Sequence, residues 1–120
     1  MGLPWVRLDT QFNTNPKVLA LVDDKQWRAL SVYVCGLGYC GVHGTDGFIP
    51  RPALPFIHGT TREASALVSV GLWAGCPGGW NVNGWAEFQE SSQETADRRK
   101  KAQAAAAARW SKVRAAEGAE

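Results

Sequence analysis

The stretch Thr45–Gln89, TDGFIPRPALPFIHGTTREASALVSVGLWAGCPGGWNVNGWAEFQ, is the most informative part of this 120-residue chain about its fold. It opens on a turn signal, Thr-Asp-Gly, and continues into Phe48–Pro50, which predicts a very short apolar strand. Two short helices are then predicted over Arg51–Ile57 and Thr61–Val70, because a His-Gly-Thr break separates two apolar patterns at helical spacing. The stretch therefore predicts a helical pair joined by a tight turn.

A hairpin follows the helical pair directly. Leu72–Ala74 and Trp80–Val82 predict its two strands, and the turn between them contains Pro77 and two glycines. Two helices followed by a hairpin predict an α+β fold of the winged helix-turn-helix type, which presents its second helix to the DNA major groove. The predicted contacts of this body with double-stranded DNA are Arg51, Thr61, Arg62, Ser65 and Ser69. The alternative is that the second helix is a packed element used for protein contacts.

The residues before this stretch predict two more helices. Asn15 and Pro16 start a short one, and Asp23 and Asp24 are expected to cap a second that runs to about Gly41. An extended lead-in is predicted over residues 5–12, where it could pair with the sheet. The predicted core, including the helical stripe on the second helix, consists of Trp27, Leu30, Val34, Leu37, Leu67, Trp73 and Trp80.

Charge divides the chain into a body, residues 1–90, and a tail, residues 91–120. The body has six basic and seven acidic residues, whereas the tail has seven basic and four acidic residues. The body is therefore net −1 and the tail net +3, so an electrostatic attraction to nucleic acid is expected mainly from the tail.

The tail is predicted to be a basic, alanine-rich helix. Ser91 with Glu94 forms a capping-box pattern, and Ala104–Ala108 is a run of the best helix former. Trp110 could stack on a base or cover a partner's surface. The predicted phosphate contacts are Arg98, Arg99, Lys100, Lys101, Arg109, Lys112 and Arg114. The alternative is a solvated helix that keeps the protein soluble.

Catalysis and metal binding find little support in the sequence. A zinc site can be imagined from Cys40, His43, His58 and Cys76, but only the first two have the close spacing of structural zinc ligands. A buried, reduced thiol is the simpler interpretation of Cys40. We therefore expect no enzyme activity, no cofactor and no metal.

The longest apolar run, residues 29–42, is too short to span a bilayer. No secretion leader is visible either. These two observations predict a cytoplasmic protein without membrane contact.

Several segments together resemble a known family. They are PWVRLDTQF, NPKVLAL, TDGFIP, ALVSVGLW, GGWNVNGWAEFQ and KAQAAAAARW, which run from about Pro4 to Trp110. The chain resembles small phage and prophage helix-turn-helix proteins of actinobacteria, and is similar to the amino-terminal winged-helix domain of phage replication-initiation (replisome-organiser) proteins. The resemblance implies DNA binding in replication initiation or transcriptional control within a bacterial cell, without catalytic residues. The fuller initiators of this kind also have a helicase-loading domain, which these segments do not include, so a complete initiator role is not expected. The competing expectation is a module that oligomerises or binds a host protein.

Overall fold

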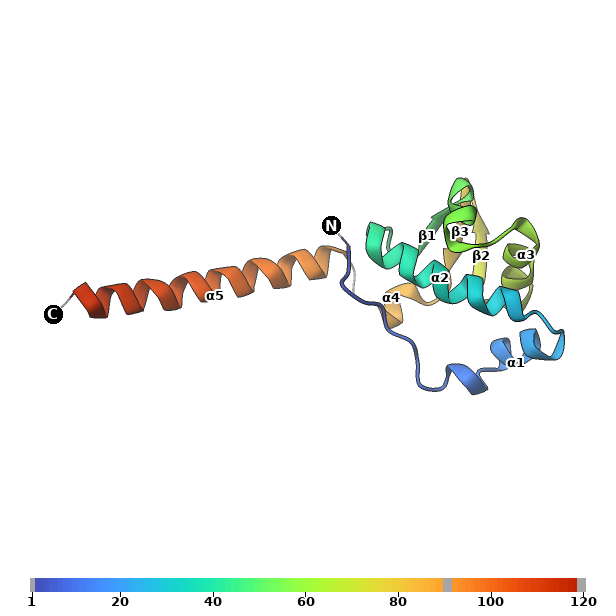
Figure 1. Cartoon of the computed structure of the whole chain (residues 1–120), viewed down its shortest axis with the longest axis horizontal. Coiled ribbons are helices and arrows are strands. Elements are labelled where there is room, and N and C mark those ends of the chain that lie inside the picture. The colour runs from blue at the N-terminus through green and yellow to red at the C-terminus, as the bar shows by residue number, and fades with distance from the viewer. Residues whose placement is uncertain (1, 90–91, 119–120) are drawn as a thin grey trace.

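The computed structural model describes residues 2–89 and 92–118, with side chains described for residues 2–89 and 97–113 (Figure 1). The chain combines helices with a small antiparallel sheet and is an α+β structure. Two elements, η1 and η2, are 3₁₀ helices. In chain order the elements are η1 (Phe12–Thr14), α1 (Pro16–Asp23), α2 (Trp27–His43), β1 (Phe48–Pro50), η2 (Arg51–Ile57), α3 (Thr61–Val70), β2 (Trp73–Cys76), β3 (Gly79–Val82), α4 (Trp85–Phe88) and α5 (Ser92–Gly118).

The sheet has three strands in the order β1-β3-β2, and both pairs are antiparallel. Trp80 of β3 lies opposite Ile49 of β1 and Gly75 of β2. Trp73 pairs with Val82, so the two tryptophan rings meet diagonally across the hairpin, with centroids 5.8 Å apart. The predicted strand and hairpin are confirmed, and so is the expectation that both tryptophans are buried.

Gly79 begins β3 and lies opposite Pro50, close to the backbone of β1. A Cβ atom at this position would collide with the carbonyl oxygen of Ile49. Only glycine lets the two backbones come this close. The glycine pair in the predicted turn thus allows the central strand to join β1 as well as β2.

The predicted core of α2 is partly wrong. Trp27 is 59% exposed and Val34 is also exposed, whereas Leu37 is buried and Leu30 packs at the edge of the core. The buried face instead carries mostly small residues, namely Ala29, Val32, Gly36, Leu37, Cys40 and Gly41. Glycine matters here because a Cβ on Gly36 would lie 3.1 Å from Ile49 Cδ1 and 3.2 Å from Trp73 Cζ2. The small face lets α2 approach the sheet, and Trp27 and Val34 remain exposed.

The start of α2 also differs from the prediction. Asn15 caps α1 as expected, its side chain accepting a hydrogen bond from the Lys17 N–H at 2.9 Å. Asp24, however, is the C-terminal cap of α1, and α2 begins only after Gln26. Asp23 is the last residue of α1, and Lys25 has a left-handed φ of 58°, so a tight turn separates both aspartates from the start of α2.

The predicted helical pair is present. Arg51–Ile57 forms the short 3₁₀ helix η2, which contains Pro55, and α3 spans the predicted residues Thr61–Val70. Gly71 ends α3 with a φ of 85°, as expected for a left-handed helix terminus. The turn between the helices contains His58, also left-handed at φ 62°.

The N-terminal segment does not pair with the sheet, which corrects that expectation. Among the described residues the sheet contains only β1, β3 and β2. The Leu3 N–H instead donates to the Gly41 carbonyl at 2.7 Å, which fixes the segment to the end of α2. The Arg7 backbone is bound further on by the Gln89 side chain. The N-terminal segment therefore connects the end of α2 to the end of the body. Its backbone is held by the Gly41 carbonyl and by the side-chain amide of Gln89.

The tail forms one long helix, α5, of 27 residues. At 1.5 Å per residue it is about 40 Å long, and it extends away from the body along the long axis of the molecule (Figure 1). Ser91 of the predicted capping box lies outside the described residues, as does the side chain of Glu94. In the described part of the chain, no helix has both the length and the apolar character needed to cross a membrane.

Candidate nucleic-acid interface

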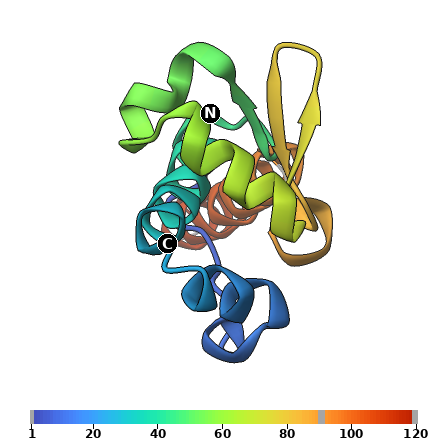
Figure 2. The ribbon, with the colours of Figure 1, turned by 90° about the vertical axis from the view of Figure 1, so that its right-hand side faces the viewer.

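The four predicted contact residues of α3 share its outer face. Thr61, Arg62, Ser65 and Ser69 are all exposed. The opposite face is buried through Glu63, Ala64 and Leu67, which pack toward α2 and the sheet. Figure 2 shows α3 crossing the front of the body with the β2–β3 hairpin beside it. The outer face is therefore small, polar and accessible, and its only charge among these four residues is positive.

Glu63 is the acidic residue of α3, and its carboxylate is turned inward. It accepts hydrogen bonds from the Thr60 hydroxyl at 2.7 Å and from the Thr60 N–H at 3.3 Å, and Arg28 Nε lies 3.6 Å away. Burial alone would raise the pKa of Glu63, but the Thr60 hydrogen bonds, its own backbone N–H and Arg28 hold that pKa below the ordinary value of 4.5. The negative charge at the start of α3 is thus buried and paired with Thr60 and Arg28.

A group of basic side chains that the sequence did not indicate gathers at the N-terminus of α3. Lys25 and Arg28 come from the α1–α2 turn and the first turn of α2, and they line a depression together with Arg62. The remaining lining residues are Asp24, Gln26 and Glu63. The side chain of Arg28 is 76% exposed even though it pairs with Glu63. Backbone N–H groups at a helix N-terminus also favour anions. The left-handed turn at Lys25 brings these residues together, and no local sequence pattern predicts it.

Arg51 is the first residue of η2 and lies against the hairpin. Its guanidinium carbon is 4.8 Å from the centre of the Trp80 ring, and its backbone N–H donates to the Gly78 carbonyl at 2.9 Å. A cation over a tryptophan face is held by the ring's negative potential. Arg51 therefore extends the positive surface toward the hairpin turn while covering a core residue.

The tail bases are far from α3 in this structure. Figure 1 shows α3 at one end of the body and α5 leaving from the other, and in Figure 2 α5 recedes behind α3. Six of the seven predicted phosphate contacts are exposed, and the side chain of Arg114 lies outside the described ones. Arg109 borders an apolar stripe on α5 that consists of Ala106, Trp110 and Val113. The structure therefore groups the α3 residues with each other, and does not bring the tail bases to them.

The thiol and imidazole groups considered for chemistry do not come together. Within residues 2–89 and 92–118, no three His, Cys, Asp or Glu side chains are placed to hold a metal ion. Cys35, Cys40 and Cys76 are all free thiols. Burial raises the pKa of the Cys40 thiol, which lies 3.6 Å from the Phe48 carbonyl oxygen as a weak hydrogen-bond donor. Cys40 is thus kept protonated within the core, as its structural interpretation predicts.

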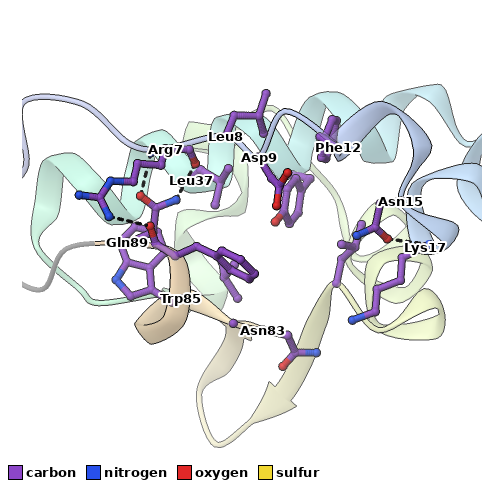
Figure 3. Close-up of a pocket in the computed structure, with 15 residues that line it drawn as sticks. Arg7, Leu8, Asp9, Phe12, Asn15, Lys17, Leu37, Asn83, Trp85 and Gln89 are labelled. Carbon is purple, nitrogen blue, oxygen red and sulfur yellow. Dashed lines mark hydrogen bonds between the residues drawn. The ribbon is translucent and has the colours of Figure 1, made fainter.

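A narrow cleft of about 120 Å³ lies where the N-terminal segment passes α2 and α4 (Figure 3). Arg7, Asp9 and Lys17 lie around it, together with the Phe12 and Trp85 rings. Arg7 and Gln89 are joined by two hydrogen bonds on one side of the cleft, and the Lys17 ammonium donates to the Gly71 carbonyl at 3.2 Å. The cleft thus marks the seam that fastens the N-terminal segment to the body.

Comparison with known proteins adds no relative: no protein-family model, no curated protein and no solved structure matches this chain.

Proposed function

We propose that the protein is a non-catalytic DNA-binding protein, with a winged helix-turn-helix body and α3 as its recognition helix. The order of elements supports this assignment: α2 and β1 precede a helical pair, η2 and α3, and the β2–β3 hairpin follows in an antiparallel β1-β3-β2 sheet. In such a domain the second helix of the pair enters the major groove and the hairpin lies beside it. The resemblance to phage helix-turn-helix proteins supports a role in replication initiation or transcriptional control.

The observation that carries this proposal is the chemistry of the α3 surface. Its exposed face has hydroxyl groups and Arg62, while its one carboxylate is buried and paired. Hydroxyl and guanidinium groups donate hydrogen bonds to phosphates and to base edges. Lys25 and Arg28 add positive charge beside the same helix end. This face could therefore approach a polyanion without a competing exposed acid on α3.

The tail would contribute in a different way. Its bases are distributed around an exposed helix, and the structure holds them away from α3. Contacts of this kind add salt-dependent affinity without sequence information. We therefore assign sequence preference to α3 and a general attraction to phosphate to α5.

The test is fluorescence anisotropy on a labelled duplex with two matched variants. Ser65→Glu places a negative charge on the outer face of α3, and Ser31→Glu places the same charge on an exposed site of α2. Because a carboxylate facing phosphates is repelled, Ser65→Glu should weaken duplex binding by about tenfold or more, or about 1.4 kcal/mol. Ser31→Glu should bind like the wild type. Equal binding by all three proteins would remove α3 from the interface and contradict the proposal.

A salt titration then separates α3 from the tail. Replacing residues 98–101 by glutamine should flatten the slope of log affinity against log salt by about 0.9 for each phosphate that the variant no longer neutralises. Arg62→Ala should instead change the preference among duplex sequences, by about 1–3 kcal/mol at one base for a bidentate contact. An unchanged slope in the glutamine variant would exclude the tail from binding.

One observation favours a second function, a protein-interaction module. An apolar depression of about 520 Å³ opens on the surface between α2 and η2, with Phe56 77% exposed at its edge. Its other lining residues are Cys35, Gly38, Tyr39, Val42 and His43. Exposed apolar surfaces of this kind mark contacts with other proteins. If the wild-type protein binds no DNA at low salt, the DNA-binding proposal fails and this function takes its place.

A further inference from the structure

A second basic surface lies at the junction of the N-terminal segment and the tail. A notch of about 130 Å³ is lined there by Trp5 and Arg7 from the segment and by Arg98 and Arg99 from α5. Gln89, the last residue of the body that the structure describes before the tail, also lines it. Residues separated by more than 80 positions in the sequence thus form one surface, at the opposite end of the body from α3 (Figure 1).

The backbone is fixed on both sides of Trp5. Leu3 is buried, and its N–H donates to the Gly41 carbonyl at 2.7 Å. The Arg7 N–H donates to Gln89 Oε1 at 2.8 Å, and Gln89 Nε2 donates back to the Arg7 carbonyl at 2.6 Å (Figure 3). Despite these anchors, the Trp5 side chain is 72% exposed. Trp5 is therefore held at the surface by a fixed backbone, with its ring open to solvent.

The seat of this segment on α2 depends on close packing. A Cβ atom at Gly41 would lie only 2.6 Å from Val6 Cγ1, next to Trp5. A side chain at position 41 would therefore force the Val6 side chain to move. The exposed indole is thus the consequence of an anchored segment and not of a loose end.

The chemistry of the notch matches one class of ligand. Among the lining residues whose side chains the structure describes, three are arginines and none is acidic. The Arg7 Nη1 donates to the Phe88 carbonyl at 3.3 Å, which holds that guanidinium at the notch. Guanidinium groups bind phosphate oxygens, often through two hydrogen bonds, and exposed indoles stack on bases. An unpaired nucleotide offers both a phosphate and an accessible base face, whereas a base within a duplex is already stacked on both sides.

We propose that this notch binds single-stranded DNA, with one base stacked on Trp5 and the adjoining phosphates held by Arg7, Arg98 and Arg99. The inference rests on the proposed function for its ligand class, nucleic acid, and adds a second site with a different preference. Because α3 and the notch lie at opposite ends of the body, a duplex and an unpaired strand can occupy the protein together.

The experiment measures binding of the full chain to a labelled dT12 strand and, separately, to a labelled duplex. Trp5→Ala should weaken dT12 binding about 5- to 140-fold, the range that stacking of one base contributes. Trp27→Ala is the matched control, because Trp27 is also an exposed tryptophan and lies on α2 away from the notch. Trp27→Ala should bind dT12 like the wild type, and Trp5→Phe should retain most of the affinity. Equal weakening of dT12 binding in Trp5→Ala and Trp27→Ala, or no weakening in either, would contradict the proposal that the notch binds single-stranded DNA.

A charge-matched pair tests the arginines. Arg98→Gln/Arg99→Gln and Lys100→Gln/Lys101→Gln remove the same charge from neighbouring positions, but only the first pair lines the notch. The first variant should bind dT12 more weakly than the second. Equal affinities of the two variants would mean that the strand follows overall charge and would contradict a defined site.

The two proposals fail in different ways. Duplex binding without dT12 binding would contradict the single-strand site at the notch and leave the proposed duplex interface on α3 standing. Binding of dT12 without duplex binding would overturn the α3 interface and support the notch. Failure to bind either nucleic acid at low salt would overturn both proposals.

Discussion

Two helices of this protein, α3 and α5, both expose polar side chains, yet they are stabilised in opposite ways. The ten-residue α3 has a capping box at its start, a left-handed glycine at its end and a buried inner face. The longer α5 contains an alanine run, and its described side chains are exposed except at Ala106, which is partly covered. The first helix owes its place to packing, whereas the second owes its helicity to local propensity. A destabilising mutation in α3 should therefore lower the stability of the whole body. A mutation in α5 should lower the helicity of α5 alone.

The largest effect that this comparison predicts is on the core beneath α3. Trp73→Ala should reduce the free energy of unfolding by about 3–5 kcal/mol, because the ring is only 1% exposed and its removal leaves a cavity. Trp27→Ala, at an exposed site, should change it by about 0.5 kcal/mol or less. Urea denaturation of the two variants measures the difference. Similar destabilisation in both would show that α2 packs through its other face.

A smaller effect is expected at the start of α3. Glu63→Gln should reduce the free energy of unfolding by about 1–2 kcal/mol near neutral pH. The substitution weakens the capping box and removes the buried carboxylate charge that pairs with Arg28. Glu87→Gln, at an exposed site of α4, is the matched control and should have little effect. Thermal or urea denaturation at pH 7 gives both values, and equal stabilities of the two variants would contradict a role for Glu63.

The same pair of variants has a predicted pH dependence. The pKa of Glu63 is lower in the folded protein than its ordinary value of 4.5. The stability from its ionised form is therefore fully present above pH 4.5, and it is lost as the pH falls through the folded pKa. The gap between wild type and Glu63→Gln should narrow on acidification. A gap that stays constant from about pH 7 to about pH 2 would show that ionisation of Glu63 does not contribute.

The smallest effect on the body is expected from the tail. Ala105→Gly/Ala107→Gly should each cost α5 about 1 kcal/mol of helix stability and reduce the far-ultraviolet circular dichroism. The cooperative unfolding midpoint of the body should stay the same, because neither side chain is buried. Ala20→Gly in α1 is the comparison, since the same substitution in a docked helix should lower that midpoint. A midpoint shift in the tail variant would mean that α5 packs on the body.

Elements with local signals could be predicted from the sequence alone. Asn15 followed by proline started α1, Gly71 ended α3, and the Pro-Gly-Gly turn placed the hairpin, because each residue type acts through its own backbone geometry. The outer face of α3 also followed from spacing, since its buried apolar residues lie at 64 and 67. These features required no knowledge of a partner element.

Tertiary packing was needed to select the buried face of α2 and the course of the N-terminal segment. Both faces of α2 have residues at helical spacing, and the sheet selected the smaller one because Gly36 allows close contact with Ile49 and Trp73. Trp27 is large and apolar, but it stays outside because it projects from the other side of the helix. The surface that joins Trp5 to Arg98 depends on hydrogen bonds between residues more than 80 positions apart, which no local pattern encodes.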